Sequence, residues 1–198
     1  RRTQQLQSDA TRRQHPMNDQ PLYPRYAQAR LEEAIADSPV VLVHGPRQYG
    51  KTTLARLVGD AHGYGYVTFD DDVQRAGALA DPVDFIASLP ERVILDEVQR
   101  TPGLFTTLKA TVDRHRTPGR FILTGSANVL LVPRLADSLA GRMEILRLHP
   151  LAQCELAATP PTFLDRLFAG SFPNRQYQRL GEELAERIVA GGYPAALK

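Results

Sequence analysis

The sequence predicts an α/β fold in which a parallel sheet is covered by helices on both faces. Over residues 40–148, short apolar segments alternate with segments of helical periodicity, which is the order of elements typical of such folds. The apolar segments are continuously hydrophobic, as expected of strands that are buried on both faces. A glycine-rich, phosphate-binding pattern directly follows the first of them. These observations predict a phosphate-binding core over residues 21–149.

Length and composition agree with this prediction. The 198 residues suffice for one domain and a small appendage. Hydrophobic residues make up 42% of the chain, enough for a substantial core, and a net charge of +2 does not by itself indicate a nucleic-acid partner. No apolar run approaches the roughly 18–20 residues that cross a membrane. The single cysteine excludes an intrachain disulfide and suits a cytoplasmic protein.

Five apolar segments are predicted strands because each is rich in Val, Ile, Leu or Phe and is bounded by turn-forming or polar residues. In chain order they are residues 40–43, 66–69, 92–97, 120–126 and 142–148. The second ends in three aspartates, the third in two carboxylates and the fourth in hydroxyl and amide side chains. Ligands bind outside the carboxyl ends of parallel strands, so these polar ends are expected to surround the site.

Helical periodicity predicts helices around these strands. They are residues 25–36, 50–58, a weaker region interrupted at Pro82, 101–115 and 129–140. The second is expected to stop near Gly59-Asp60. Thr101, which is followed by Pro102, is the expected N-cap of the fourth, and Asn128 is a candidate cap of the last.

The alternation ends after residue 149. Three segments, residues 151–158, 163–168 and 180–189, have helical character with no strand between them. They predict a small helical appendage over residues 150–198. Its apolar tail lacks a closing element, so we expect the appendage to be incomplete and the natural chain to continue.

Residues 1–20 differ from the rest of the chain. They contain four arginines, several glutamines and almost no apolar residue, which predicts a disordered leader. Two alternatives remain open: an added extension before a true start at Met17, or a basic arm that touches nucleic acid.

The loop after the first strand has the pattern G-x-x-x-x-G-K-T. Its glycines allow backbone angles that a Cβ would obstruct, so successive N–H groups can point at phosphate oxygens. The following helix adds the positive end of its dipole. In this pattern Lys51 reaches the β- and γ-phosphates, and the Thr52 hydroxyl ligates Mg²⁺. The predicted nucleotide-binding residues are Gly45, Pro46, Arg47, Gln48, Tyr49, Gly50, Lys51, Thr52 and Thr53.

Two carboxylates follow the third strand. Asp96 is predicted to complete the Mg²⁺ site with Thr52. Glu97 is placed to act as general base and to orient a water at the γ-phosphate. An adjacent glutamate favours hydrolysis over phosphoryl transfer to a second substrate. The alternative is a strand that ends in two solvated acids.

Three further positions are candidate site residues. At the end of the fourth strand, Ser126 is the predicted γ-phosphate sensor, with Thr124 and Asn128 as competitors and a capping turn as the alternative. Arg142 is a candidate arginine finger in its own subunit or a neighbour's. Alternatively, it pairs with an acid such as Glu144. Within the loop, arginine 47 contacts phosphate or pairs with one of the three aspartates after the second strand.

Five blocks of the sequence, in this order, resemble a family of bacterial and archaeal AAA-type ATPases. The blocks are GPRQYGKTT (45–53), VILDEVQR (93–100), FILTGS (121–126), SLAGR (138–142) and GGYP (191–194). In that family an N-terminal ATPase domain is usually followed by a C-terminal domain of unknown function, which we expect to be missing or cut off here. Tyr49 is a second departure, because a small aliphatic residue is more usual there.

The resemblance covers about residues 22–197 and implies a three-layer P-loop fold of the additional-strand type, with strand order 5-1-4-3-2. It also implies ATP rather than GTP as the nucleotide. The predicted function is Mg²⁺-dependent ATP hydrolysis coupled to an unidentified partner or conformational change. Two alternatives stay open: a slow nucleotide-gated switch that binds protein or nucleic acid, and phosphoryl transfer to a small molecule. Self-association is also open.

Overall fold

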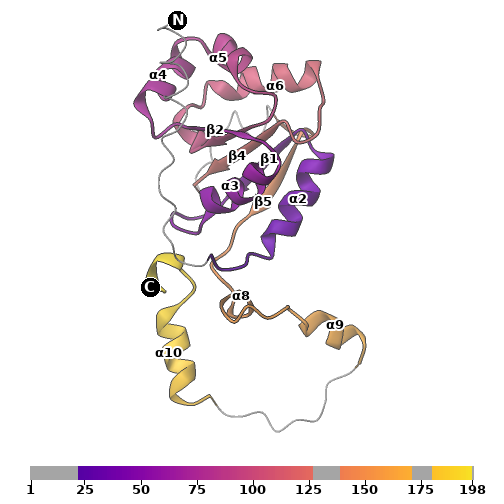
Figure 1. The fold of residues 1–198 in the computed structure, drawn as a ribbon, viewed down its shortest axis with the longest axis vertical. Coiled ribbons are helices and arrows are strands. Elements are labelled where there is room, and N and C mark those ends of the chain that lie inside the picture. Colours follow the sequence, from indigo (N-terminus) through magenta and orange to yellow (C-terminus); the bar gives the residue numbers. More distant parts are fainter. Residues whose placement is uncertain (1–21, 127–138, 171–179, 198) are drawn as a thin grey trace, which may run out of the picture.

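The structure is a computed structural model that describes residues 22–126, 139–170 and 180–197 (Figure 1). Its centre is a five-stranded sheet in the order β2-β3-β4-β1-β5, and all the neighbouring strands pair in parallel. The strands are β1 (Val40–His44), β2 (Gly65–Thr68), β3 (Val93–Asp96), β4 (Phe121–Gly125) and β5 (Met143–Arg147). Counted from the β5 edge, the order is 5-1-4-3-2, so the predicted α/β fold and topology are confirmed.

Strand β1 lies inside the sheet, between β4 and β5. Val40 is in register with Phe121 on one side and Met143 on the other. Alternate β1 residues serve opposite faces: Val40 and Leu42 belong to one hydrophobic cluster, whereas Val41 and Val43 belong to the other. This double burial explains why the central strands are continuously apolar.

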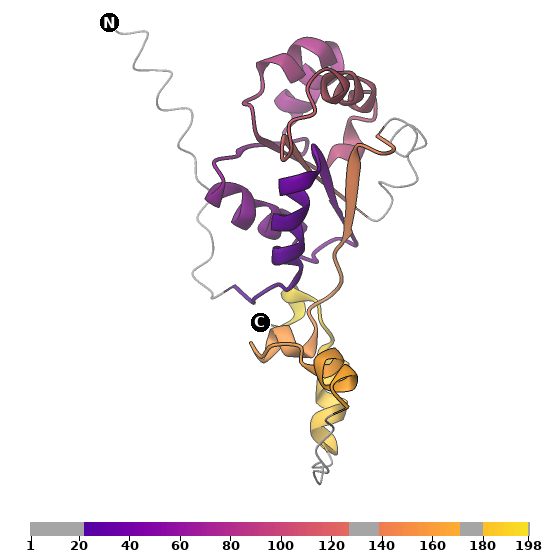
Figure 2. The same ribbon diagram turned by 90° about the vertical axis from the view of Figure 1, so that its right-hand side faces the viewer.

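Helices cover both faces of the sheet (Figures 1 and 2). On one face lie α2 (Ala27–Asp37) and α3 (Lys51–Ala61), which pack against the cluster that contains Val41. On the other lie α4 (Asp72–Ala80), α5 (Pro82–Ser88) and α6 (Leu104–Arg114), whose buried residues join the cluster that contains Val40. The short 3-10 helix η1 (Val98–Arg100) connects β3 to the segment that enters α6.

Helix α3 ends at Ala61, directly after the predicted stop near Gly59-Asp60, so this helix end is confirmed. A Cβ at Gly59 would lie 2.6 Å from the Ile94 Cδ1, so this glycine allows the helix to lie close to the sheet. Thr101 is not the N-cap of α6, because the helix begins at Leu104 and the buried Thr101 hydroxyl instead donates to the Val98 carbonyl at 3.4 Å.

The chain after β5 forms only short helices. They are α8 (Gln153–Leu156), α9 (Phe163–Phe168), α10 (Glu182–Ala190) and the 3-10 helix η3 (Pro194–Ala196). Neither α9 nor α10 has a buried residue, and both extend away from the sheet in the two views (Figures 1 and 2). The helix predicted over residues 129–140 falls almost wholly outside the described residues. Within them, no helix is long and apolar enough to cross a membrane.

Candidate functional site

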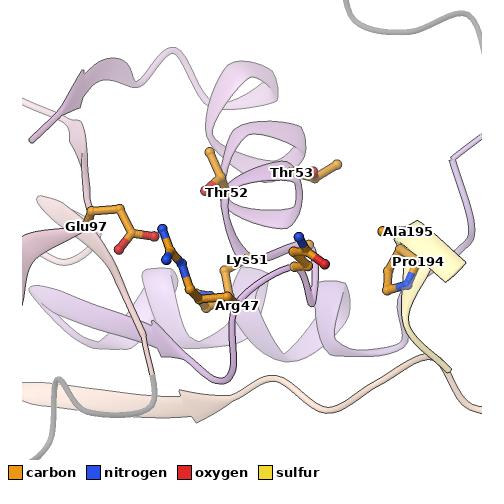
Figure 3. Close-up of a pocket in the computed structure, with 9 residues that line it drawn as sticks. Arg47, Lys51, Thr52, Thr53, Glu97, Pro194 and Ala195 are labelled. Carbon is orange, nitrogen blue, oxygen red and sulfur yellow. The ribbon is translucent and has the colours of Figure 1, made fainter. Parts of the chain in front are cut away.

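A pocket of about 750 Å³ opens at the carboxyl ends of the strands, beside the glycine-rich loop (Figure 3). Its walls come from the loop, the start of α3, the tip of β3 and the C-terminal segment. The lining residues are Arg47, Gln48, Gly50, Lys51, Thr52, Thr53, Glu97, Pro194 and Ala195. This position agrees with the rule that ligands of α/β proteins bind outside the carboxyl ends of the strands.

The loop takes a conformation that its glycines permit. Gly50 has φ +82° and immediately precedes α3, so it reverses the chain into the helix from the left-handed region. Gly45 lies so close to β5 that a Cβ would be 2.5 Å from the Leu148 carbonyl oxygen. Gln48 also has a left-handed φ, +67°, although it carries a side chain. A non-glycine residue in this region is uncommon, and such conformations concentrate at functional sites.

Lys51 is the buried cation of the site. Its side chain is 5% exposed, and its Nζ donates to the Pro46 carbonyl at 2.9 Å. Burial lowers the pKa of Lys51, whereas the carboxylates of Glu97 and Asp96 oppose that shift. None of the ion pairs found among the described residues involves this lysine. The pocket therefore presents a positive charge that is available to an anionic ligand.

Thr52 and Asp96 meet beside this lysine. The Thr52 hydroxyl donates to the Asp96 Oδ1 at 2.9 Å, which joins the start of α3 to the tip of β3. A hydroxyl and a carboxylate are hard oxygen donors of the kind that Mg²⁺ prefers. The described residues contain no cluster of three or more His, Cys, Asp or Glu that could hold a metal ion.

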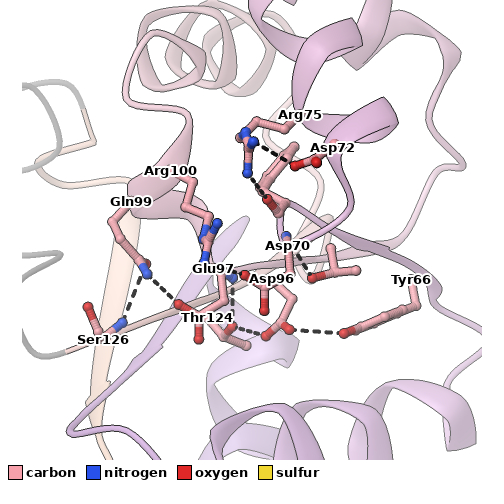
Figure 4. Close-up of polar contacts among 12 residues, drawn as sticks. Tyr66, Asp70, Asp72, Arg75, Asp96, Glu97, Gln99, Arg100, Thr124 and Ser126 are labelled. Carbon is pink, nitrogen blue, oxygen red and sulfur yellow. Dashed lines mark hydrogen bonds and ion pairs between the residues drawn. The ribbon is translucent and has the colours of Figure 1, made fainter.

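Asp96 is held by three hydroxyl groups, of which those of Thr124 and Tyr66 are drawn in Figure 4. Besides Thr52, the Thr124 hydroxyl donates to its Oδ1, and the Tyr66 hydroxyl donates to its Oδ2 at 2.9 Å. Burial and the neighbouring carboxylate raise the pKa of Tyr66, so its phenol remains a donor. Sequence reasoning missed Tyr66, although its strand lies next to β3 in the sheet. An aromatic hydroxyl two positions before the end of that strand was the available signal.

Glu97 follows β3 directly and faces the pocket (Figure 3). Its φ of +59° is left-handed, and its N–H donates to the Thr124 hydroxyl at 3.2 Å. The Gln99 side-chain amide donates to its Oε2. A non-glycine residue in this region carries about 1–3 kcal/mol of conformational strain, which the surrounding bonds must offset. The turn aims the carboxylate into the cavity rather than along the strand.

The polar tip of β4 contributes differently from what the sequence indicated. Thr124, a competitor in the prediction, is the residue that contacts both Asp96 and Glu97. Ser126, the predicted sensor, does not line the pocket, and its N–H donates to the Gln99 Oε1 at 3.4 Å. Asn128 lies outside the described residues. Thr124 reaches the carboxylates because β3 and β4 are adjacent and in parallel register.

The two candidate arginines, Arg142 and Arg47, lie at opposite ends of the sheet. Arg142 precedes β5 and lies at the amino end of the sheet, since its neighbour Met143 pairs with the first residue of β1. It forms an ion pair with Asp113 at the end of α6, not with Glu144. A role for Arg142 in the pocket of its own subunit is therefore wrong, because the loop follows the opposite end of β1. Arg47, by contrast, lines the pocket and points toward Glu97 in Figure 3.

The three aspartates after β2 do not pair with arginine 47. Asp70 binds Arg100 at 2.8 Å, and Asp72 binds Arg75 at 2.6 Å. Asp71 is the N-cap of α4, because its side chain accepts from the backbone N–H groups at the start of that helix. These carboxylates are therefore engaged locally in the described part of the chain.

The C-terminal segment forms the other wall of the pocket. Pro194 and Ala195 line it, and the Tyr193 ring meets the Tyr49 ring edge to face at a centroid distance of 4.8 Å. The Tyr49 hydroxyl also donates to the Tyr193 hydroxyl at 3.3 Å. Tyr49, the unusual loop residue, is thus the contact between loop and tail. Nothing in the spacing of the sequence indicated this approach.

Arg25, just before α2, contacts both the glycine-rich loop and the segment that follows β5. Its Nη1 donates to the Tyr49 carbonyl at 3.0 Å, and its Nη2 donates to the His149 carbonyl at 2.6 Å. Its Nε lies 3.3 Å from Glu155 in a nearly buried ion pair. Arg25 therefore ties the loop to the beginning of the appendage.

The chain is similar to several known proteins. A family model described as an AAA domain matches residues 37–157. Uncharacterized proteins of Mycobacterium bovis and Mycobacterium tuberculosis are each 41% identical over 163 residues, or 81% of this chain. The chain spans 36% of the length of these relatives.

Solved structures share the fold. AMPPCP-bound DnaA from Aquifex aeolicus has a TM-score of 0.54 at 16% identity, over 87% of this chain and 58% of that one. The Aeropyrum pernix ORC1 protein in complex with DNA has a TM-score of 0.50 at 19% identity, over 89% of this chain and 58% of that one. At these identities the likeness shows a common fold.

Proposed function

Since this chain belongs to the AAA domain family, we propose that it binds ATP with Mg²⁺ and hydrolyses it to ADP and phosphate. One observation carries the proposal. A buried lysine, the hydrogen-bonded pair of Thr52 and Asp96, and the carboxylate of Glu97 surround one pocket of about 750 Å³. A cation, a metal-binding oxygen pair and a base are the groups that hydrolysis of a nucleoside triphosphate needs.

Binding of the phosphates falls to the loop and the start of α3. The N–H groups after Gly45 and at the beginning of the helix are donors without helical partners, so they suit phosphate oxygens. Lys51 would exchange its bond to the Pro46 carbonyl for a bond to phosphate. The low exposure of this lysine strengthens its attraction to an anion, because little water screens it.

Thr52 and Asp96 would hold the metal ion. When bound, Mg²⁺ supplies positive charge that neutralises the charge developing on the phosphate oxygens. The Tyr66 and Thr124 hydroxyls fix the Asp96 carboxylate from two sides. Fixed ligands bind a metal more tightly than mobile ones, so these two hydroxyls belong to the metal site in function.

Glu97 would take the proton of the attacking water. The water oxygen forms a bond to the γ-phosphorus, the bond from that phosphorus to the bridging oxygen breaks, and the proton passes to the Glu97 carboxylate. Aspartate 96 is less suited to this role because three hydroxyls already donate to it. Glu97 instead faces the cavity that Arg47 and Lys51 also line.

The base of the nucleotide would lie at the end lined by Pro194 and Ala195. Glu97 marks the γ-phosphate end of the pocket, and the C-terminal segment forms the wall away from it (Figure 3). The small apolar surface there suits a flat ring. ATP is the proposed nucleotide because DnaA, which has the same fold, was solved with the ATP analogue AMPPCP.

A slow nucleotide-gated switch is a second candidate function. It is favoured by the Tyr49–Tyr193 contact, through which the loop touches a segment that continues from α10. In this proposal, residues 21–149 are the nucleotide-binding unit and residues 150–198 transmit its state to a partner. Turnover measured with and without DNA, RNA and candidate proteins distinguishes the two, because a switch stays slow until its partner is present.

The direct test is ATP binding and phosphate release by this chain with and without Mg²⁺. Glu97→Gln should retain ATP binding and lose turnover by about 10²–10⁴-fold. Lys51→Ala should lose binding itself, and Arg30→Ala on the exposed side of α2 should change neither. Unaltered turnover in the Glu97 variant removes its role as base. Unaltered ATP affinity in the Lys51 variant overturns the proposed site.

A further inference from the structure

Gln99 joins the tips of two neighbouring strands beside the pocket. It lies on η1, two positions after Glu97 (Figure 4). Its amide nitrogen donates to the Glu97 Oε2, and its amide oxygen accepts from the Ser126 N–H at 3.4 Å. One side chain therefore connects the carboxylate after β3 to the backbone at the end of β4.

The side-chain amide of Gln99 has the donor and the acceptor that these two contacts need. A carboxylate accepts hydrogen bonds but donates none, and a backbone N–H donates but does not accept. The bridging group must therefore carry a donor on one side and an acceptor on the other. This requirement also fixes the orientation of the Gln99 amide, because the flipped amide would set oxygen against oxygen at Glu97.

The Glu97 side chain depends on this bridge. Within the described chain, Gln99 makes the only side-chain hydrogen bond found to the Glu97 carboxylate. The Glu97 backbone is strained at φ +59° and held through its N–H by the Thr124 hydroxyl. The backbone thus fixes where the side chain starts, but only Gln99 restricts where the carboxylate ends.

We propose that Gln99 is a positioning residue that orients the Glu97 carboxylate toward the attacking water and links it to the tip of β4. The inference rests on the proposed hydrolysis of ATP and deepens it. A general base works within hydrogen-bond reach of the proton that it takes, so a loose carboxylate is a slow base. Gln99 itself does not line the pocket, so it affects the chemical step and not the binding of nucleotide.

Two nearly isosteric substitutions test this role. Gln99→Glu keeps the acceptor for the Ser126 N–H but opposes a carboxylate to Glu97, and Gln99→Met removes both bonds. Both should lower kcat about 10- to 100-fold, since misplacement forfeits part of the general-base contribution. The Kd for ATP should stay within about twofold, because phosphate contacts are intact.

The matched control is Gln28→Glu. Gln28 Nε2 donates to the Glu32 Oε1 at 3.0 Å on the exposed face of α2, so this variant removes the same kind of bond with the same change in charge. It should leave kcat unchanged. Melting temperatures of all variants should remain near that of the wild type, which separates a positioning role from a merely structural one.

A double-mutant cycle asks whether Gln99 acts through Glu97. In the Glu97→Gln background, Gln99→Met should lower the residual turnover no further, because the group that it orients is gone. Three results would each overturn the proposal. The losses of turnover from the two substitutions could be additive, or a Gln99 variant could lose as much ATP affinity as kcat. Alternatively, kcat could be unchanged in both Gln99 variants. If the wild type hydrolyses no ATP at all, the proposed function itself fails, which is a different result.

Discussion

The two ends of the pocket are built in opposite ways. At the phosphate end, Asp96 and Glu97 extend from a buried strand, and hydroxyls from β2, β4 and α3 hold them. At the other end, the C-terminal segment rests on the loop through one pair of tyrosine rings and lines the cavity with two small residues. The core of the sheet fixes the geometry of the phosphate end. The other end depends on few contacts, so we expect nucleotide-dependent change to concentrate there.

The largest effect on turnover should come from a substitution at the phosphate end of the pocket. Asp96→Asn keeps the shape of the side chain but removes its charge, so turnover at fixed Mg²⁺ should fall by about 10- to 100-fold and more Mg²⁺ should be needed for half-maximal rate. Magnesium titrations of ATPase activity measure this. Asp60→Asn, at an exposed ion pair on α3, is the control that should not change the titration. Equal Mg²⁺ requirements for wild type and Asp96→Asn would remove Asp96 from the metal site.

Substitutions at the end of the pocket lined by Pro194 and Ala195 should change the affinity for the base of the nucleotide and not for its phosphates. Ala195→Leu adds bulk where we propose that the nucleotide ring binds, so affinity for ATP should fall about tenfold, or 1.4 kcal/mol. Affinity for inorganic tripolyphosphate, which has no base, should not change. Calorimetric titration of both ligands gives the comparison.

Ala196→Leu is the matched control for that experiment, because its neighbour Ala195 lines the pocket and Ala196 does not. It should leave both affinities unchanged. If Ala195→Leu weakens ATP and tripolyphosphate equally, the C-terminal segment does not form a base site, and the contrast between the two ends is lost.

Removal of one hydroxyl from the phosphate end should have a moderate effect on stability and turnover. Tyr66→Phe leaves one oxygen of the buried Asp96 without its donor, which should lower the free energy of unfolding by about 1–2 kcal/mol. Turnover should decrease several-fold as the carboxylate loosens. Urea denaturation and steady-state kinetics measure the two effects. An unchanged rate would mean that Thr52 and Thr124 alone are sufficient to hold the carboxylate.

The smallest effect should come from Arg142, at the amino end of the sheet. Its bond holds the pKa of Asp113 below the usual value, so the pair stabilises the fold above the unfolded-state pKa of about 3.9 and loses this effect as pH falls through the lowered value. Arg142→Gln should therefore melt slightly earlier than wild type at pH 7, and the difference should vanish in acid. ATPase activity at concentrations where the chain is monomeric should be unchanged, and a loss of activity there would contradict the placement.

The sheet was predictable because its signals are local. Apolar runs mark buried strands, and glycines mark turns, so each signal is read from residues close together in the sequence. The parallel arrangement of the strands then brings the carboxylates at their ends to one edge of the sheet. Asp96 and Glu97 could therefore be placed beside the loop from spacing alone. Tyr66, Gln99 and Tyr193 could not, because their partners depend on side-chain reach between neighbouring strands or on a contact over 144 positions.

Other positions depend on contacts that the sequence does not show. Gly59, near the predicted end of its helix, also makes room for Ile94 of the sheet. Ser126 was preferred to Thr124 as the sensor, and the structure adds that the Thr124 hydroxyl lies against Asp96. Arg142 was considered near phosphate because its motif adjoins a strand, and only the direction of that strand places it at the far edge.

One backbone bond gives the appendage a mechanical consequence. The Leu151 N–H donates to the Gly192 carbonyl at 2.8 Å, and a Cβ at residue 192 would lie 2.5 Å from the Leu151 carbonyl oxygen, so only glycine lets the two segments cross. The segment that leaves β5 and the segment that forms the pocket wall are therefore fastened together at this crossing. We expect a displacement of either segment to move the other.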